Sequence, residues 1–345
     1  MEPTYSQTPE AQHALALVKN LQRYFVKKLE ALSQIFGDNV PFEAVTWLRD
    51  EGLHGGGTRY EARDDKLFNR GSVNISQIHY TDLSEKKLDS ATAISTIIHP
   101  ANPHVPSLHM HISWTQYKDG SGYWRIMADL NPAVAYGEDQ QRFIDALEFV
   151  APQQFDEGAA NGDRYFYIPA LQRHRGVAHF YLENYATGDF EEDYAFAKRF
   201  GEHVVEAYSS IIADALMRRT EISDDDRAFQ LGYHTLYFFQ VLTLDRGTTS
   251  GLLVHDQNDI GIMGSLPSHV DKTLLQAWIE RMTPPQDVLL QSLIDALPEG
   301  DVVAIDENTK KRLAEAVRTH YRQYPQALDM QAQSPIVPPT VDNHA

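Results

Sequence analysis

The chain has 345 residues, of which 42% are hydrophobic and 23% charged, a balance typical of a globular protein. Asp and Glu number 48 against 30 for Lys and Arg, and the formal net charge of −18 argues against non-specific binding to nucleic acid or to an anionic membrane. The absence of cysteine excludes disulfides, thiolate metal ligands and cysteine nucleophiles. No stretch approaches the roughly 20 apolar residues of a membrane span, and the first residues lack a secretory leader pattern. A cytoplasmic protein is expected.

The first predicted element is an amphipathic helix over residues 10–36, where apolar side chains recur at helical spacing. Gly37 follows it and is expected to form a left-handed helix cap. Further along, residues 108–115 alternate apolar and polar side chains, as half-buried strands do. Residues 118–122 have a turn composition and 123–130 resemble a second strand, so a hairpin is predicted over 108–130.

The rest of the chain alternates between predicted helices and strands. Helices are expected at 138–150, 190–219, 285–297 and 308–323, and strands at 177–183, 236–244, 250–256 and 260–266. Strands grouped into hairpins between helices predict an α+β fold, a large antiparallel sheet flanked by helices on both faces. Without a repeat or linker, one domain is expected over residues 1–330, followed by a disordered Pro- and Gln-rich tail at 331–345.

Several short motifs carry a resemblance to a known family. The segment from His99 to His109, HPANPHVPSLH, resembles the H-P-x-N-P-x-x-P-x-x-H stretch of oxygen-dependent coproporphyrinogen III oxidases. The same family's motifs are matched, in order over about residues 40–300, by Gly55-Gly56-Gly57, Val73-Asn74-Ile75-Ser76, Ala128-Asp129-Leu130-Asn131-Pro132, Leu244-Asp245-Arg246-Gly247-Thr248 and Met263-Gly264-Ser265-Leu266-Pro267. The chain thus resembles a divergent member of this family.

The resemblance implies an enzyme that converts propionate side chains of a tetrapyrrole into vinyl groups. Members of the family use dioxygen as co-substrate and no bound metal or organic cofactor, and they are homodimers with a large antiparallel sheet between helices. Applied to this chain, the resemblance implies a carboxylate-bearing small molecule as substrate, acted on in porphyrin and heme biosynthesis. Neither a nucleic-acid partner nor a membrane span is expected.

The chain departs from the family where arginines are expected. Thr58 follows the glycine run and Ser113 lies in the strand after the H-P-x-N-P motif, two positions at which the family has arginine. Guanidinium groups bind carboxylates in a bidentate manner, so their loss weakens the case for a tetracarboxylate substrate. The remaining candidates for gripping a carboxylate are Arg175 and Arg246, and the matched motifs add Asn102 and Gly247 as substrate-binding residues.

Histidines replace other residues at several altered positions and suggest a metal site. If Gly120 is the centre of the hairpin turn, His111 lies directly opposite Asp129, with His109 on the same face. His179, on the predicted strand at 177–183, could join them. Two or three imidazoles with one carboxylate would suit non-haem iron, manganese or zinc. The alternative is that these histidines form an ordinary polar strand face.

The predicted catalytic residues are His99, His109, Asp129 and Asp245. By the resemblance, the two carboxylates face pyrrole N–H groups or accept a proton, while His99 could move protons near neutral pH. Two of these residues also have a purely structural alternative. Asp245 could form a turn or cap a helix, and His99 could be a hydrogen-bonded loop histidine.

Three functions follow. The first is oxygen-dependent oxidative decarboxylation, as in coproporphyrinogen III oxidase. The second is a metal-dependent oxidase or oxygenase with the same fold and a smaller substrate. The third is a tetrapyrrole-binding protein without catalytic activity.

Overall fold

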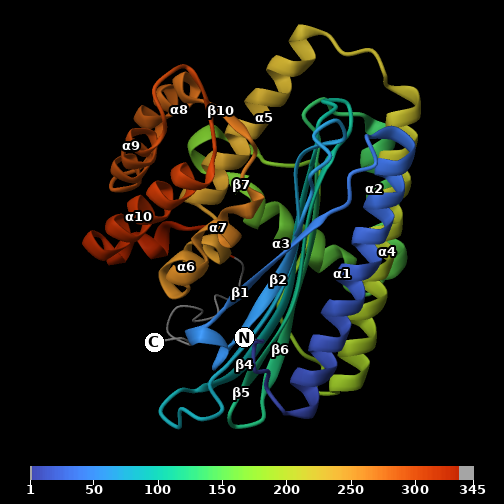
Figure 1. The fold of residues 1–345 in the computed structure, drawn as a ribbon, viewed down its shortest axis with the longest axis vertical. Coiled ribbons are helices and arrows are strands. Elements are labelled where there is room, and N and C mark those ends of the chain that lie inside the picture. Colours follow the sequence, from blue (N-terminus) through green and yellow to red (C-terminus); the bar gives the residue numbers. More distant parts are fainter. Residues whose placement is uncertain (1, 334–345) are drawn as a thin grey trace.

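A computed structural model describes residues 2–333 and is built around a seven-stranded antiparallel sheet (Figure 1). The strands are β1 (Glu43–Leu48), β2 (Gly55–Glu61), β3 (Phe68–His79), β4 (Leu88–Pro100), β5 (Ser107–Tyr117), β6 (Gly122–Asn131) and β9 (Ala178–Tyr185), adjacent in that order. Two small pairs lie outside this sheet, β7 (Tyr167–Ile168) with β8 (Arg173–His174) and β10 (His269–Asp271) with β11 (Val302–Ala304).

Helices cover both faces of the sheet, as the sequence predicts (Figure 1). One face carries α1 (Pro9–Phe36), α2 (Gly137–Val150) and α4 (Phe190–Arg218), and α3 (Phe155–Phe166) packs against β9. The other face carries α5 (Asp224–Thr243), α6 (Arg246–Val254), α7 (Asp259–Ile262), α8 (Lys272–Trp278), α9 (Gln286–Ala296) and α10 (Glu307–Gln323). The predicted α+β class is confirmed.

The alternation in β5 explains how the two layers are divided. Its even-numbered side chains, among them Met110 and Ile112, are fully buried in the core that the sheet shares with α1 and α4. Its odd-numbered side chains, among them His109 and His111, face the second layer of helices. The polar half of the strand pattern therefore lies inside the molecule, between the sheet and helices α5–α7.

The predicted helices at 10–36, 138–150, 190–219, 285–297 and 308–323 and the hairpin at 108–130 are confirmed within a residue or two. Asp189 caps α4 by accepting hydrogen bonds from the backbone N–H groups of Glu191 and Glu192. The three strands predicted between residues 236 and 266 are wrong, because this segment forms α5, α6 and α7. Residues 233–243 of α5 are buried on every side, so their apolar run has no helical period to detect.

Two predictions about chain ends need correction. Gly37 is not left-handed, with φ of −102°; it is required because any Cβ would collide with the carboxylate of Asp64. The tail is ordered at its start, since Gln331 is buried and its amide donates to the hydroxyl groups of Thr249 and Tyr321. Residues 334–345 lie outside the described part. None of the helices within residues 2–333 has the length and apolar character to cross a membrane.

Candidate active site

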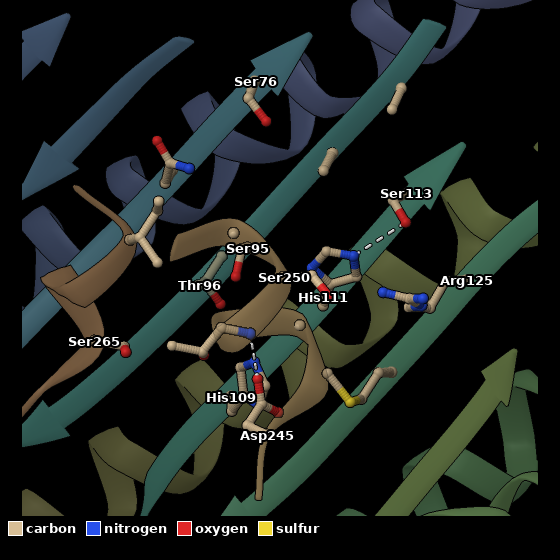
Figure 2. Close-up of a pocket in the computed structure, with 18 of the residues that line it drawn as sticks. Ser76, Ser95, Thr96, His109, His111, Ser113, Arg125, Asp245, Ser250 and Ser265 are labelled. Atoms are coloured by element: carbon tan, nitrogen blue, oxygen red, sulfur yellow. Dashed lines mark hydrogen bonds between the residues drawn. The ribbon is translucent and has the colours of Figure 1, made fainter. Parts of the chain in front are cut away.

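A cavity of about 290 Å³ lies between the sheet and the second layer of helices. Its floor is formed by side chains of β3, β4, β5 and β6, and its roof by α5, α6 and the segment from His255 to Ser265. Figure 2 shows His109 and His111 of β5, Arg125 of β6 and Asp245 beside this cavity. Serines dominate the polar part of the wall, with Ser76, Ser95 and Ser113 on three neighbouring strands.

The hairpin register places one histidine opposite the buried aspartate, but not the predicted one. His109 pairs with Asp129 and His111 with Met127, so the predicted pairing of His111 with Asp129 is wrong. The turn is centred on Asp119, because its carboxylate accepts hydrogen bonds from the backbone and hydroxyl of Ser121 and Gly120 takes a φ of +86°. His109, His111 and Asp129 nevertheless share one face of the sheet, as expected.

Asp129 lies beneath His109, where solvent does not reach it. Its carboxylate accepts hydrogen bonds from Nη2 of Arg175 at 2.6 Å and from the amide of Asn131 at 2.5 Å, and Nδ1 of His109 lies 3.0 Å away. Burial raises the pKa of Asp129, but the charges of Arg175 and His109 outweigh burial and hold the pKa far below its usual value. Asp129 is therefore a permanent carboxylate that fixes the orientation of His109.

All three nitrogens of the Arg175 guanidinium donate hydrogen bonds to the protein. Besides Asp129 it donates to Oε1 of Gln240 at 2.6 Å and to Oδ1 of Asn131 at 3.3 Å. Its guanidinium carbon lies 4.4 Å from the ring centre of Phe166 and 4.9 Å from that of Tyr237. Arg175 borders the cavity, but these contacts leave it to hold Asp129 rather than to bind a carboxylate of the substrate.

The predicted metal ligands are not gathered into one site. His179 does lie opposite Asp129 on β9, but its Nδ1 bonds to the carboxylate of Asp163 at 2.8 Å. Burial and the charge of Arg125 hold the pKa of His111 well below its usual value, and its Nε2 lies 3.0 Å from the hydroxyl of Ser113. Within residues 2–333, no group of three or more His, Asp and Glu side chains could hold a metal ion.

Asp245 supplies a carboxylate from the roof of the cavity. It caps α6 by accepting a hydrogen bond from the backbone N–H of Thr248 at 2.6 Å, and its other oxygen accepts one from the hydroxyl of Tyr165 at 3.1 Å. Of the predicted structural alternatives, a turn or a cap, the structure shows a helix cap, and Gly247 borders the cavity within the same helix. A carboxylate with only neutral partners can still accept a hydrogen bond from a ligand N–H group.

A model of the coproporphyrinogen III oxidase family matches residues 13–280. The chain belongs to this family. The matched residues include the whole sheet and the roof helices α5, α6 and α7. Asp245 of the Leu244-Asp245-Arg246 motif therefore lines the same cavity as His109, the partner of Asp129 in the Ala128-Asp129-Leu130 motif, although more than 100 residues separate the two motifs in the sequence.

Other residues predicted from coproporphyrinogen III oxidase motifs lie outside the cavity wall. His99 is fully buried, with Nδ1 2.9 Å from the hydroxyl of Ser107 and Nε2 3.2 Å from the carbonyl of Ser265. Asn102 donates to the carbonyl of Arg219 and so orders a loop. Arg246 bonds to Glu183 behind the wall. These side chains support the site without lining it.

Arg125 is the cavity residue that sequence reasoning missed. It lies directly across from Ser113, the position at which the resemblance to coproporphyrinogen III oxidases predicts an arginine. The guanidinium of Arg125 thus lies on the neighbouring strand, on the same face of the sheet as Ser113. The alternation of residues 123–130 places Arg125 on the polar face of the strand. Only the pairing register of β5 and β6 in the structure shows that Arg125 lies opposite Ser113.

Proposed function

We propose that the protein is an oxidoreductase that oxidatively decarboxylates a propionate side chain of a pyrrole, as coproporphyrinogen III oxidase does with dioxygen as co-substrate. For each side chain, the propionate and dioxygen, with one proton, would give a vinyl group, carbon dioxide and hydrogen peroxide. The C–C bond to the carboxylate and one C–H bond break, and the two electrons pass to dioxygen. The substrate would be a tetrapyrrole such as coproporphyrinogen III.

The observation that carries this proposal is that Asp245 lines the same cavity as His109, which is held from behind by the buried Asp129. Asp245 would accept the hydrogen bond of a pyrrole N–H and stabilise positive charge as the ring loses electrons. His109, oriented by Asp129, would exchange a proton with the reacting group or with reduced oxygen. The cavity would exclude water and hold the side chain in a reactive geometry.

The test is turnover of coproporphyrinogen III by the purified protein in air. We expect vinyl products by chromatography of the oxidised porphyrins, with matching oxygen uptake. Asp245→Asn should lower kcat by about 10- to 100-fold, because an uncharged amide stabilises a developing cation poorly. Asp256→Asn is the matched control and should retain activity, because the Asp256 side chain is exposed and does not line the cavity, although its segment forms part of the roof.

Absence of turnover with intact folding would contradict the proposal. Porphyrin binding by absorbance without oxygen uptake would instead indicate the non-catalytic tetrapyrrole-binding function. The geometry of the described residues does not favour the metal-dependent alternative over the first function. The homodimer and the cytoplasmic location remain predictions.

A further inference from the structure

The cavity end at Arg125 carries a positive charge that the protein does not balance. Nη2 of Arg125 and Nη2 of Arg246 both donate to Oε1 of Glu183, each at 2.6 Å. The side chains are 14%, 9% and 2% exposed for Arg125, Arg246 and Glu183. Within residues 2–333, Glu183 is the one carboxylate that forms an ion pair with either guanidinium. Two buried cations thus share one anion, an arrangement that an added anion would stabilise.

Of the two arginines, Arg125 is the one that borders the cavity. Its Nε is buried and has no hydrogen-bond partner, so the contact with Glu183 does not satisfy the whole guanidinium. In front of it the floor is open, because the row from Ser113 continues through Ala93 to Ser76, all small residues on neighbouring strands. Figure 2 shows Arg125 beside His111 and Ser113 on the cavity floor. His111 stays neutral, so it does not compete for an anion.

The other charged groups of the cavity wall are already committed or have the opposite sign. Each of the three guanidinium nitrogens of Arg175 already donates to a protein side chain, Asn131, Gln240 or Asp129. Asp245 is the carboxylate of the wall and accepts from neutral donors only. Of the wall histidines, His109 lies against Asp129 and His255 against Arg49, and polar wall residues such as Asn74 and Ser95 carry no charge. The cavity therefore has one free cationic pole and one anionic pole.

We propose that Arg125 binds a carboxylate of the substrate, and that the enclosed part of the substrate carries a single carboxylate together with an N–H group that faces Asp245. This inference rests on the proposed function for the choice of a pyrrole carboxylate. The planar guanidinium offers two parallel N–H donors to such a group. A ligand with several enclosed carboxylates would find no second uncommitted arginine or lysine in the part of the wall formed by residues 2–333.

The experiment uses 3-(1H-pyrrol-3-yl)propionic acid and its methyl ester as probes, with binding measured by titration calorimetry. The wild-type protein should bind the acid about 10- to 100-fold more tightly than the ester, because charged hydrogen bonds are lost with the ester. Arg125→Gln should remove this preference, and Arg125→Lys should retain part of it. Arg142→Gln is the matched control, since Arg142 pairs with Asp214 on the opposite side of the sheet and should leave the preference unchanged.

Equal binding of acid and ester by the wild type would overturn the inference, as would a preference that survives in Arg125→Gln, or no binding of either probe in the millimolar range. If Arg125→Gln does not fold by circular dichroism, the wild-type preference and its reduction in Arg125→Lys decide the question. The outcome is separable from that of the proposed function. Acid binding that depends on Arg125 without turnover of coproporphyrinogen III refutes only the function; turnover with a KM unaffected by Arg125→Gln refutes only the inference.

Discussion

At the scale of single residues, the site is organised around the ion pair between Asp129 and Arg175. Both side chains are 0% exposed, so neither charge is stabilised by water. Two buried charges in close contact are stable only as a pair with their remaining hydrogen bonds satisfied, and Asn131 and Gln240 complete that network. The pair joins β6 to the loop before β9, the bond from Arg175 to Gln240 extends this network to α5, and Asp129 holds His109 at the cavity floor.

The first prediction at this scale concerns Asp129→Asn. It keeps the shape of the side chain but leaves Arg175 as an unpaired buried cation. The free energy of unfolding at neutral pH should fall by about 3–5 kcal/mol in urea denaturation. Asp119→Asn is the control in the same hairpin, since Asp119 lies in the exposed turn, and its effect should be small. Equal stability of Asp129→Asn and wild type would show that the pair does not hold the site together.

Residue-level prediction succeeded where strand alternation was sufficient. Alternation alone places His109, His111 and Asp129 on one face, and the structure confirms it. It could not determine which histidine faces Asp129, since the register depends on how Asp119 closes the turn. Alternation also could not show that Arg175 forms an ion pair with Asp129. That contact joins β6 to the loop before β9, two segments far apart in the sequence, so residue spacing within one strand does not reveal it.

At the scale of elements, α10 holds the roof of the cavity from outside the matched family span. Arg318 of α10 donates to both carboxylate oxygens of Asp259 on α7, at 2.7 and 2.8 Å, and to the carbonyl of Leu252 on α6. Gly261 and Ile262 of α7 border the cavity. The helix predicted at 308–323 from its amphipathic period therefore supports the site, which its sequence pattern alone does not indicate.

Arg318→Gln tests this connection. The side chains of Arg318 and Asp259 are both mostly buried, so loss of this ion pair should lower the free energy of unfolding by about 3 kcal/mol. Loosening α7 should also raise the KM for coproporphyrinogen III more than it lowers kcat. Arg322→Gln on the same helix is the matched control. Arg322 is 68% exposed and its ion pair with Glu315 is long, at 3.7 Å, so its loss should have little effect on stability. Unchanged stability and KM in Arg318→Gln would separate α10 from the site.

At the scale of the whole molecule, the two layers differ in how well the sequence reveals them. The layer of α1 and α4 has one buried and one exposed side in each helix, so the helical period marks it. The layer of α5 to α7 lies between the sheet and α8–α10, and α5 is enclosed along residues 233–243. The family motif at 244–248 placed this region in the site even though its secondary structure was predicted as strand.

Enclosure of the second layer also makes the stability of the whole molecule depend on pH. Burial, then the charge of His269, lowers the pKa of His234 on α5 to about 3. Burial likewise lowers the pKa of His99 and His111 well below the usual value. Below about pH 6.5 the unfolded chain takes up protons that the folded protein does not, so stability falls as the pH falls. Asp129 adds a loss only below about pH 4, since its pKa is depressed.

His234→Gln should therefore reduce the pH dependence of stability in urea denaturation between about pH 7.5 and pH 5. Well below pH 6.5, each of the three histidines should contribute a slope of about 1.4 kcal/mol per pH unit, and the variant should lose one such contribution. The slope is informative even if the substitution lowers stability at every pH, because such a change is a constant offset. His13→Gln, with its side chain 54% exposed on α1, should keep the wild-type slope. An unchanged slope in His234→Gln would mean that His234 is protonated in the folded protein, contrary to its enclosure between α5 and the sheet.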